Sequence, residues 1–205
     1  FTVSVVAQTT VTLTPVPGST VFTGSAITFT FTGGELESGV EVVIDSITYN
    51  SAPDGADSVL DAGSYTVTFA VTGNSADNNY WYTVSSWEGD ISPATVEANA
   101  VTAVYGDVYT ALETGGNLQN DGEWQFVTFN GSPVKVTVTV TDATARAGET
   151  YLRAGTHDVT VTLVSGNFTF AGDNSSVAST LQITPKQLNI AAQLPEDLTY
   201  TSEGI

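Results

Sequence analysis

A single histidine, His157, is the side chain of this sequence best suited to proton transfer or metal binding near neutral pH. No Ser-His-Asp or Cys-His arrangement can be assembled around it, and the chain contains no cysteine. His157 alternates with Val159, Val161 and Leu163, which places it on the apolar face of a predicted strand. We therefore expect His157 to pack in a core, and we assign no catalytic residue.

Carboxylates are abundant, because the chain has 22 Asp and Glu residues against 4 Lys and Arg. Paired carboxylates can hydrolyse glycosides, but a chain this acidic contains such pairs by composition alone. Aspartates in loops would also suit Ca²⁺, a hard ion that takes about six to eight oxygen ligands. The loop aspartates that could contribute to such a site are Asp54, Asp57, Asp61, Asp77 and Asp173. None has EF-hand spacing, so we favour solvated turns, with calcium as the only candidate cofactor.

Flat aromatic rings could stack against sugars, and one short segment is rich in them. The sequence contains a second copy of this segment, in which Phe168 and Phe170 align with Tyr80 and Tyr82. We therefore expect both tyrosines in the core. Trp81 and Trp87 have no aromatic counterpart and share strand parity, so they could form an exposed pair. These two tryptophans are the candidate ligand-binding residues; packing on a neighbouring repeat or loop is the alternative.

The net charge of −18 excludes several classes of partner. Nucleic acids and anionic lipids are bound through Lys and Arg patches, which this chain lacks. No apolar run approaches the roughly 18 to 20 residues that span a bilayer. A hydrophobic content of 41% nevertheless indicates a folded chain. We therefore expect a folded protein that does not bind nucleic acid and does not insert into a membrane.

The regular segments alternate apolar and hydroxyl-bearing residues with a period of two, as half-buried β-strands do. This pattern is clear in residues 65–72, 134–140 and 157–163. No segment shows a convincing helical period, although residues 107–115 would fit one or two helical turns. The sequence predicts an all-β fold, β-grasp-like or sandwich-like, with two tandem elongated domains and at most a short helix in each.

The chain repeats itself. Residues 61–69 match 153–161 and residues 91–96 match 183–188, so both matches have an offset of 92 residues. An early turn, Phe22-Thr23-Gly24, also aligns with Tyr105-Gly106-Asp107. The predicted organisation is the last strand of a preceding repeat or an N-terminal strand in 1–10, repeats in 11–95 and 96–188, and the start of a further repeat in 189–205.

Four short motifs recur in the same order in both copies, although the first copy departs from the pattern at the early turn, where it has Phe22-Thr23-Gly24. They are the aromatic turn Tyr105-Gly106-Asp107, Ala-Gly-x-[Tyr/His] at a strand start, Asn-aromatic at Asn79-Tyr80 and Asn167-Phe168, and the closing segment 181–188. In this order they resemble the MBG repeats, also called mostly-β-grasp or YDG-type repeats, which occur in tandem in large bacterial surface adhesins. The resemblance covers nearly the whole chain. It implies a β-grasp-like domain with an adhesive or spacer role, and it supplies no catalytic residues.

The sequence therefore predicts a non-catalytic, extracellular module of a bacterial cell-surface adhesin, acting as a stalk or spacer, with an adhesive role left open. Its expected partners are the neighbouring repeats of the same chain, with host or cell-surface glycans or proteins as alternatives. Two other functions stay open. One is a fibre subunit assembled by β-strand addition through residues 1–8, and the other is an acidic carbohydrate-binding module.

Overall fold

The computed structural model describes residues 7–49, 61–110, 118–120, 124–141 and 152–188. All regular secondary structure in these residues is β-strand, which confirms the all-β prediction. The helical turn expected in residues 107–115 is wrong in its first part, because Val108–Thr110 form a strand, and residues 111–115 lie outside the described residues. The described part contains no helix able to cross a membrane.

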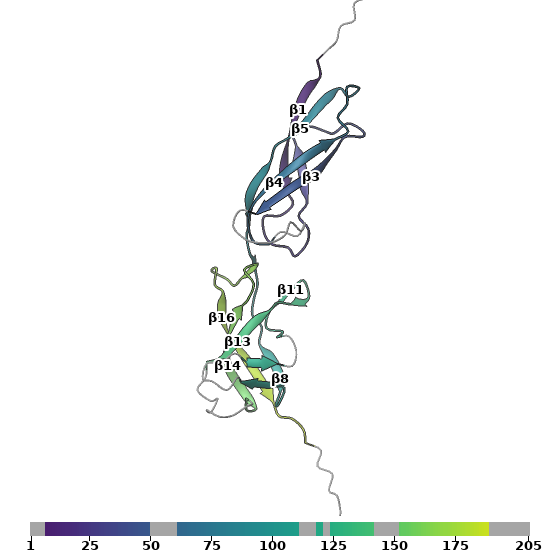
Figure 1. Cartoon of the computed structure of the whole chain (residues 1–205). Coiled ribbons are helices and arrows are strands. Elements are labelled where there is room, and N and C mark those ends of the chain that lie inside the picture. The colour runs from purple at the N-terminus through teal and green to yellow at the C-terminus, as the bar shows by residue number, and fades with distance from the viewer. Residues whose placement is uncertain (1–6, 50–60, 111–117, 121–123, 142–151, 189–205) are drawn as a thin grey trace, which may run out of the picture.

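The strands form two units that follow one another end to end (Figure 1). The first unit comprises residues 9–92 and the second unit residues 94–184. Pro93 separates them, because Ser92 still pairs with Val21 of the first unit whereas Ala94 already pairs with Phe168 of the second. The predicted division between residues 95 and 96 lies just after this point. The expected flanking segments fall largely or wholly outside the described residues, which begin at residue 7 and end at 188.

The first unit consists of two three-stranded sheets with the orders β2-β1-β5 and β3-β4-β6. Its strands are β1 (Thr9–Pro17), β2 (Phe29–Thr32), β3 (Glu41–Tyr49), β4 (Gly63–Thr72), β5 (Tyr80–Val84) and β6 (Trp87–Ile91). β1 runs parallel to β5, whereas the other neighbours are antiparallel. The apolar face predicted for β4 faces the core, because Tyr65 and Val67 are buried.

The second unit is organised around a four-stranded sheet with the order β13-β14-β16-β8. Its strands are β7 (Ala94–Thr95), β8 (Val101–Val104), β9 (Val108–Thr110), β10 (Leu118–Asn120), β11 (Thr128–Phe129), β12 (Ser132–Pro133), β13 (Val136–Val140), β14 (Gly155–Leu163), β15 (Phe168–Thr169) and β16 (Ser176–Thr184). The valines and leucines that alternate along β13 and β14 fill one continuous core with Trp124 and Phe126. Lys135, on the hydroxyl-bearing side of that segment, is exposed.

The strand register is the same in both units. Gly63 pairs with Ile91 in the first unit, and Gly155 pairs with Ile183 in the second, so both partners are displaced by 92 residues. The same backbone hydrogen bond holds the early turn in both units. The backbone N–H of Phe22 donates to the carbonyl of Ser92 at 2.8 Å, and the N–H of Tyr105 donates to that of Thr184 at 2.8 Å. One backbone plan is therefore built twice.

Candidate functional site

His157 is a buried core residue, as predicted, with only 5% of its surface exposed. Its Nε2 lies 2.8 Å from the carbonyl oxygen of Arg153. A carbonyl only accepts, so Nε2 carries the proton and donates it. Tyr65 occupies the same place in the first unit, where its hydroxyl donates to the carbonyl of Asp61 at 2.9 Å. The two side chains perform one structural task, which is to tie β4 or β14 to the segment before it.

Tyr65 also packs against Tyr49, with ring centroids 4.6 Å apart. The hydroxyl of Tyr49 donates to the carbonyl of Ala62 at 2.9 Å. Burial raises the pKa of Tyr65 to about 12, so its hydroxyl keeps its proton at neutral pH and acts as a donor. The two tyrosines therefore fix the start of β4 through their hydrogen bonds to Asp61 and Ala62.

The two candidate tryptophans do not form an exposed pair. Trp87 is partly buried: it packs edge-on against Phe29, with ring centroids 5.5 Å apart, and lies against the core cluster around Tyr65. Its indole also covers Gly89, because a Cβ at that glycine would lie 2.5 Å from Trp87 Cζ2. Trp81 remains 43% exposed on β5. The sugar-stacking surface predicted from the sequence is thus reduced to one ring.

The assignment of Tyr80 to the core is wrong, because Tyr80 is 43% exposed, whereas that of Tyr82 is confirmed at 2%. Tyr80 is the first residue of β5 and lies at the outer end of the first unit. Tyr82 lies two residues further in, where its hydroxyl donates to the carbonyl of Glu35 at 2.9 Å. Residues two apart on a strand point to the same side of the sheet, so both rings face the same way. Within the first unit, however, only the ring of Tyr82 is covered.

The aspartates proposed for calcium lie in separate parts of the fold. Asp61 precedes β4, Asp77 lies between β4 and β5, and Asp173 lies in the second unit between β15 and β16; Asp54 and Asp57 lie outside the described residues. Asp173 has a φ of 58°, a left-handed turn conformation that Asp tolerates. Among the residues that the structure describes, no three acidic or histidine side chains are grouped closely enough to hold a metal ion.

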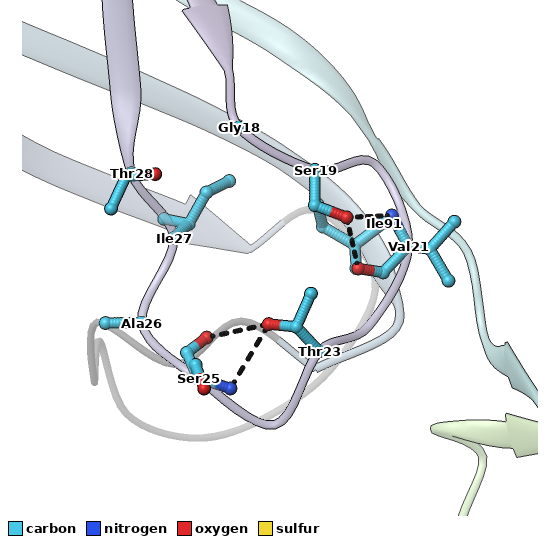
Figure 2. Close-up of a pocket in the computed structure, with 9 residues that line it drawn as sticks. All are labelled: Gly18, Ser19, Val21, Thr23, Ser25, Ala26, Ile27, Thr28 and Ile91. Atoms are coloured by element: carbon cyan, nitrogen blue, oxygen red, sulfur yellow. Dashed lines mark hydrogen bonds between the residues drawn. The ribbon is translucent and has the colours of Figure 1, made fainter. Parts of the chain in front are cut away.

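A pocket of about 290 Å³ opens in the first unit between the segment 18–28 and Ile91 (Figure 2). Two of its hydroxyl groups, those of Ser19 and Thr23, are bonded within their own loop. Ser19 Oγ donates to the carbonyl of Val21 at 2.8 Å, and Thr23 Oγ1 donates to that of Ser25 at 3.3 Å. The lining residues are small, apolar or hydroxylic, and none is titratable. The lining therefore offers hydroxyl groups but no acidic or basic side chain.

The two units meet in an aromatic cluster formed by Phe22 of the first unit and Phe129 and Phe168 of the second. The ring of Phe22 lies edge-on to Phe168 with centroids 5.4 Å apart, and stacks on Phe129 at 5.9 Å. Phe129 and Phe168 are themselves edge-on at 5.1 Å. These separations fall in the range in which aromatic rings attract one another. We call this contact and the hydrogen bonds around it the joint.

Hydrogen bonds fix the orientation of the two units at the joint. The side-chain amide of Asn167 bridges them, since its Oδ1 accepts from the N–H of Ala62 at 2.8 Å and its Nδ2 donates to Asp61 Oδ1 at 2.6 Å. On the other side, Asn130 Nδ2 donates to the carbonyl of Thr23 at 3.0 Å. Three directional bonds around an aromatic centre specify one relative placement rather than a loose tether.

The joint was not predicted from the sequence, although several of its residues are repeat markers there. A usable signal was Asn130-Gly131, a strong two-residue hairpin sequence. Both residues have positive φ, 51° and 79°, and they connect β11 to β12 in a hairpin that projects toward the first unit (Figure 1).

Comparison of the chain with protein-family models, with curated proteins and with solved structures finds no match in any of the three.

Proposed function

We propose that the chain is a non-catalytic stalk module of an extracellular protein on a bacterial cell surface, in which tandem β-units supply length and stiffness. The observation that carries the proposal is the joint, which holds two copies of one unit end to end. Support for the location comes from the resemblance to tandem adhesin repeats and from the net charge of −18, which suits a solvated surface. An adhesive role would add exposed loops to the same scaffold.

The connection between the units favours stiffness over flexibility. Only Pro93 separates the last paired residue of the first unit from the first paired residue of the second. Proline fixes its own φ and biases the residue before it toward an extended conformation. A one-residue proline connection, combined with the joint, leaves little freedom for the units to swing.

Solution scattering of the whole chain tests the proposal. We expect the profile of one extended particle with its two units end to end. A variant carrying Phe22→Ala and Asn167→Ala should give a broader distribution of unit orientations, because it loses both the central ring and the bridging amide. Trp81→Ala, an exposed ring on β5, is the matched control and should leave the profile unchanged. A parent chain whose units are already as variable as in the double variant would overturn the stalk proposal.

The carbohydrate-binding alternative now depends mainly on Trp81, since one side of Trp87 packs against the core. The fibre alternative depends on residues 1–8, of which only Ala7 and Gln8 are described. Gln8 Nε2 donates to the carbonyls of Ser75 and Asn78 of its own chain, at 2.9 and 2.6 Å. This end of the segment is thus held within the first unit, which favours the stalk over strand exchange between molecules.

A further inference from the structure

The turn of the β11–β12 hairpin carries a side chain that can react without an enzyme. Asn130-Gly131 is the only Asn-Gly step in the sequence. The amide carbon of an asparagine can be attacked by the backbone nitrogen of the next residue, which makes asparagine a thermally labile residue. A side chain on that next residue hinders the attack. Glycine has none, so the hindrance to this reaction is lowest at Asn130.

The turn leaves the reacting groups accessible. Asn130 and Gly131 are both exposed, and a Cβ added at Gly131 would meet no atom within 4 Å. Within the part of the chain that the structure describes, the N–H of Gly131 has no hydrogen-bond partner. The Gly131 nitrogen can therefore lose its proton without breaking a hydrogen bond, and water can reach the product.

The side-chain amide of Asn130 is also one of the donors that hold the joint. Its Nδ2 donates to the carbonyl of Thr23 at 3.0 Å. Thr23 lies in the first-unit loop that Figure 2 shows. A carbonyl only accepts, so this contact requires an N–H on the side chain at position 130. A carboxylate there would bring two acceptors together and would add negative charge to a chain whose net charge is already −18.

We propose that Asn130 is a site of spontaneous deamidation and that its conversion weakens the joint. The Gly131 nitrogen forms a bond to Asn130 Cγ, and the bond from Cγ to Nδ2 breaks. Nδ2 leaves as ammonia, taking the proton that the Gly131 nitrogen gives up. Water then opens the cyclic imide at either carbonyl, so that its hydroxyl joins the carbonyl carbon and its remaining proton returns to the nitrogen. The product is aspartate or isoaspartate, and neither has the donor that Thr23 needs.

This modification goes beyond the stalk function, and its chemistry does not depend on that function. Because the reaction consumes only water, the converted fraction grows with the age of the chain. Isoaspartate also routes the main chain through Cβ, which lengthens a turn that joins the paired residues Phe129 and Ser132. A stalk that is stiff when new would therefore become more flexible at this joint with time.

Peptide mapping by mass spectrometry tests the site. The whole folded chain is aged in mildly alkaline buffer made with heavy-oxygen water, and the peptide with residue 130 should gain one heavy oxygen. Asn174 is the matched control, because it is exposed, its Nδ2 donates to the carbonyl of Ala171 at 2.8 Å, and Ser175 follows it. Asn130 should convert at least about tenfold faster than Asn174. Conversion of Asn130 no faster than that of Asn174 would overturn the assignment.

A second measurement tests the effect on the joint. Asn130→Asp reproduces one product, and Asn174→Asp is its control. The N–H of Ala62, which donates to Asn167 across the joint, should exchange about two- to tenfold faster in Asn130→Asp than in the parent chain, and at the parent rate in the control. Equal exchange in both variants would overturn the proposed weakening. Scattering of the freshly prepared chain still tests the stalk proposal, so the two failures are distinguishable.

Discussion

The pair Phe22 and Phe168 offers the sharpest test of the joint, because the two rings belong to different units. Replacing either by alanine changes the packing of its own unit as well, so single variants do not isolate the contact. A double-mutant cycle removes these separate costs and leaves the coupling free energy between the two rings. That coupling is a property of the joint alone.

Its magnitude follows from the geometry. The rings are edge-on, with centroids 5.4 Å apart and planes at 89°. Such pairs contribute about 0.5 to 1.5 kcal/mol beyond the burial of their surfaces. We therefore expect the double variant Phe22→Ala with Phe168→Ala to be more stable than the sum of the single losses predicts, by about that amount.

Amide hydrogen exchange is the appropriate assay, because it reports the free energy of opening for each unit separately. The matched control cycle combines Phe31→Ala with Phe168→Ala. Phe31 packs against Phe69 inside the first unit, with ring centroids 5.3 Å apart, so its effect should add to that of Phe168 within about 0.3 to 0.5 kcal/mol. A coupling for Phe22 and Phe168 no larger than in this control would refute the reasoning.

Three further predictions concern the units themselves. The pKa of Tyr65 is raised from 10.0 to about 12, so its contribution to stability is complete below pH 10 and is lost as the pH rises through 12. The alkaline unfolding of Tyr65→Phe should therefore lack the loss of stability between pH 10 and 12. His157→Tyr should retain stability in urea denaturation, since tyrosine makes the equivalent bond in the first unit, whereas His157→Phe should lose about 0.5 to 1.5 kcal/mol. Trp87→Ala should cost about 2 kcal/mol and Trp81→Ala less than about 1 kcal/mol, and equal losses on thermal unfolding would contradict the packing of Trp87 against the core.

The sequence was sufficient to predict the strands whose two faces differ in polarity. The alternation of β4 and β14 predicted which side chains are buried, and the match between Tyr65 and His157 predicted the role of the histidine. The alternation predicts burial because the apolar face of a strand must pack against other residues wherever the strand lies in the fold. The offset of 92 residues likewise corresponds to a shared register.

Contacts between units could not be predicted in this way. Tyr80 follows the alternation of a core residue but lies at the end of its strand, where cover must come from another unit. Trp87 has no counterpart in the other copy, so the sequence left exposure and packing as alternatives, and the absence of a side chain at Gly89 leaves space for its indole to pack. The rings of Phe22 and Phe129 come from distant parts of the chain and share no period, so nothing local indicates that they meet.

The direction of the paired strands determines how the array would respond to being pulled. In the second unit, β8 lies near the entry of the chain and β16 near its exit, and the two are parallel partners from Val101 with Leu181 to Val104 with Thr184. Tension along the chain would draw them past each other lengthwise, so the hydrogen bonds of the ladder would be loaded in shear together rather than opened one by one. The corresponding contact in the first unit is the isolated bridge between Val21 and Ser92. The first unit also has a longer parallel ladder, from Thr9 with Tyr80 to Leu13 with Val84, which tension along the chain would load in shear as well. Both units should therefore resist being pulled through parallel ladders whose hydrogen bonds break together.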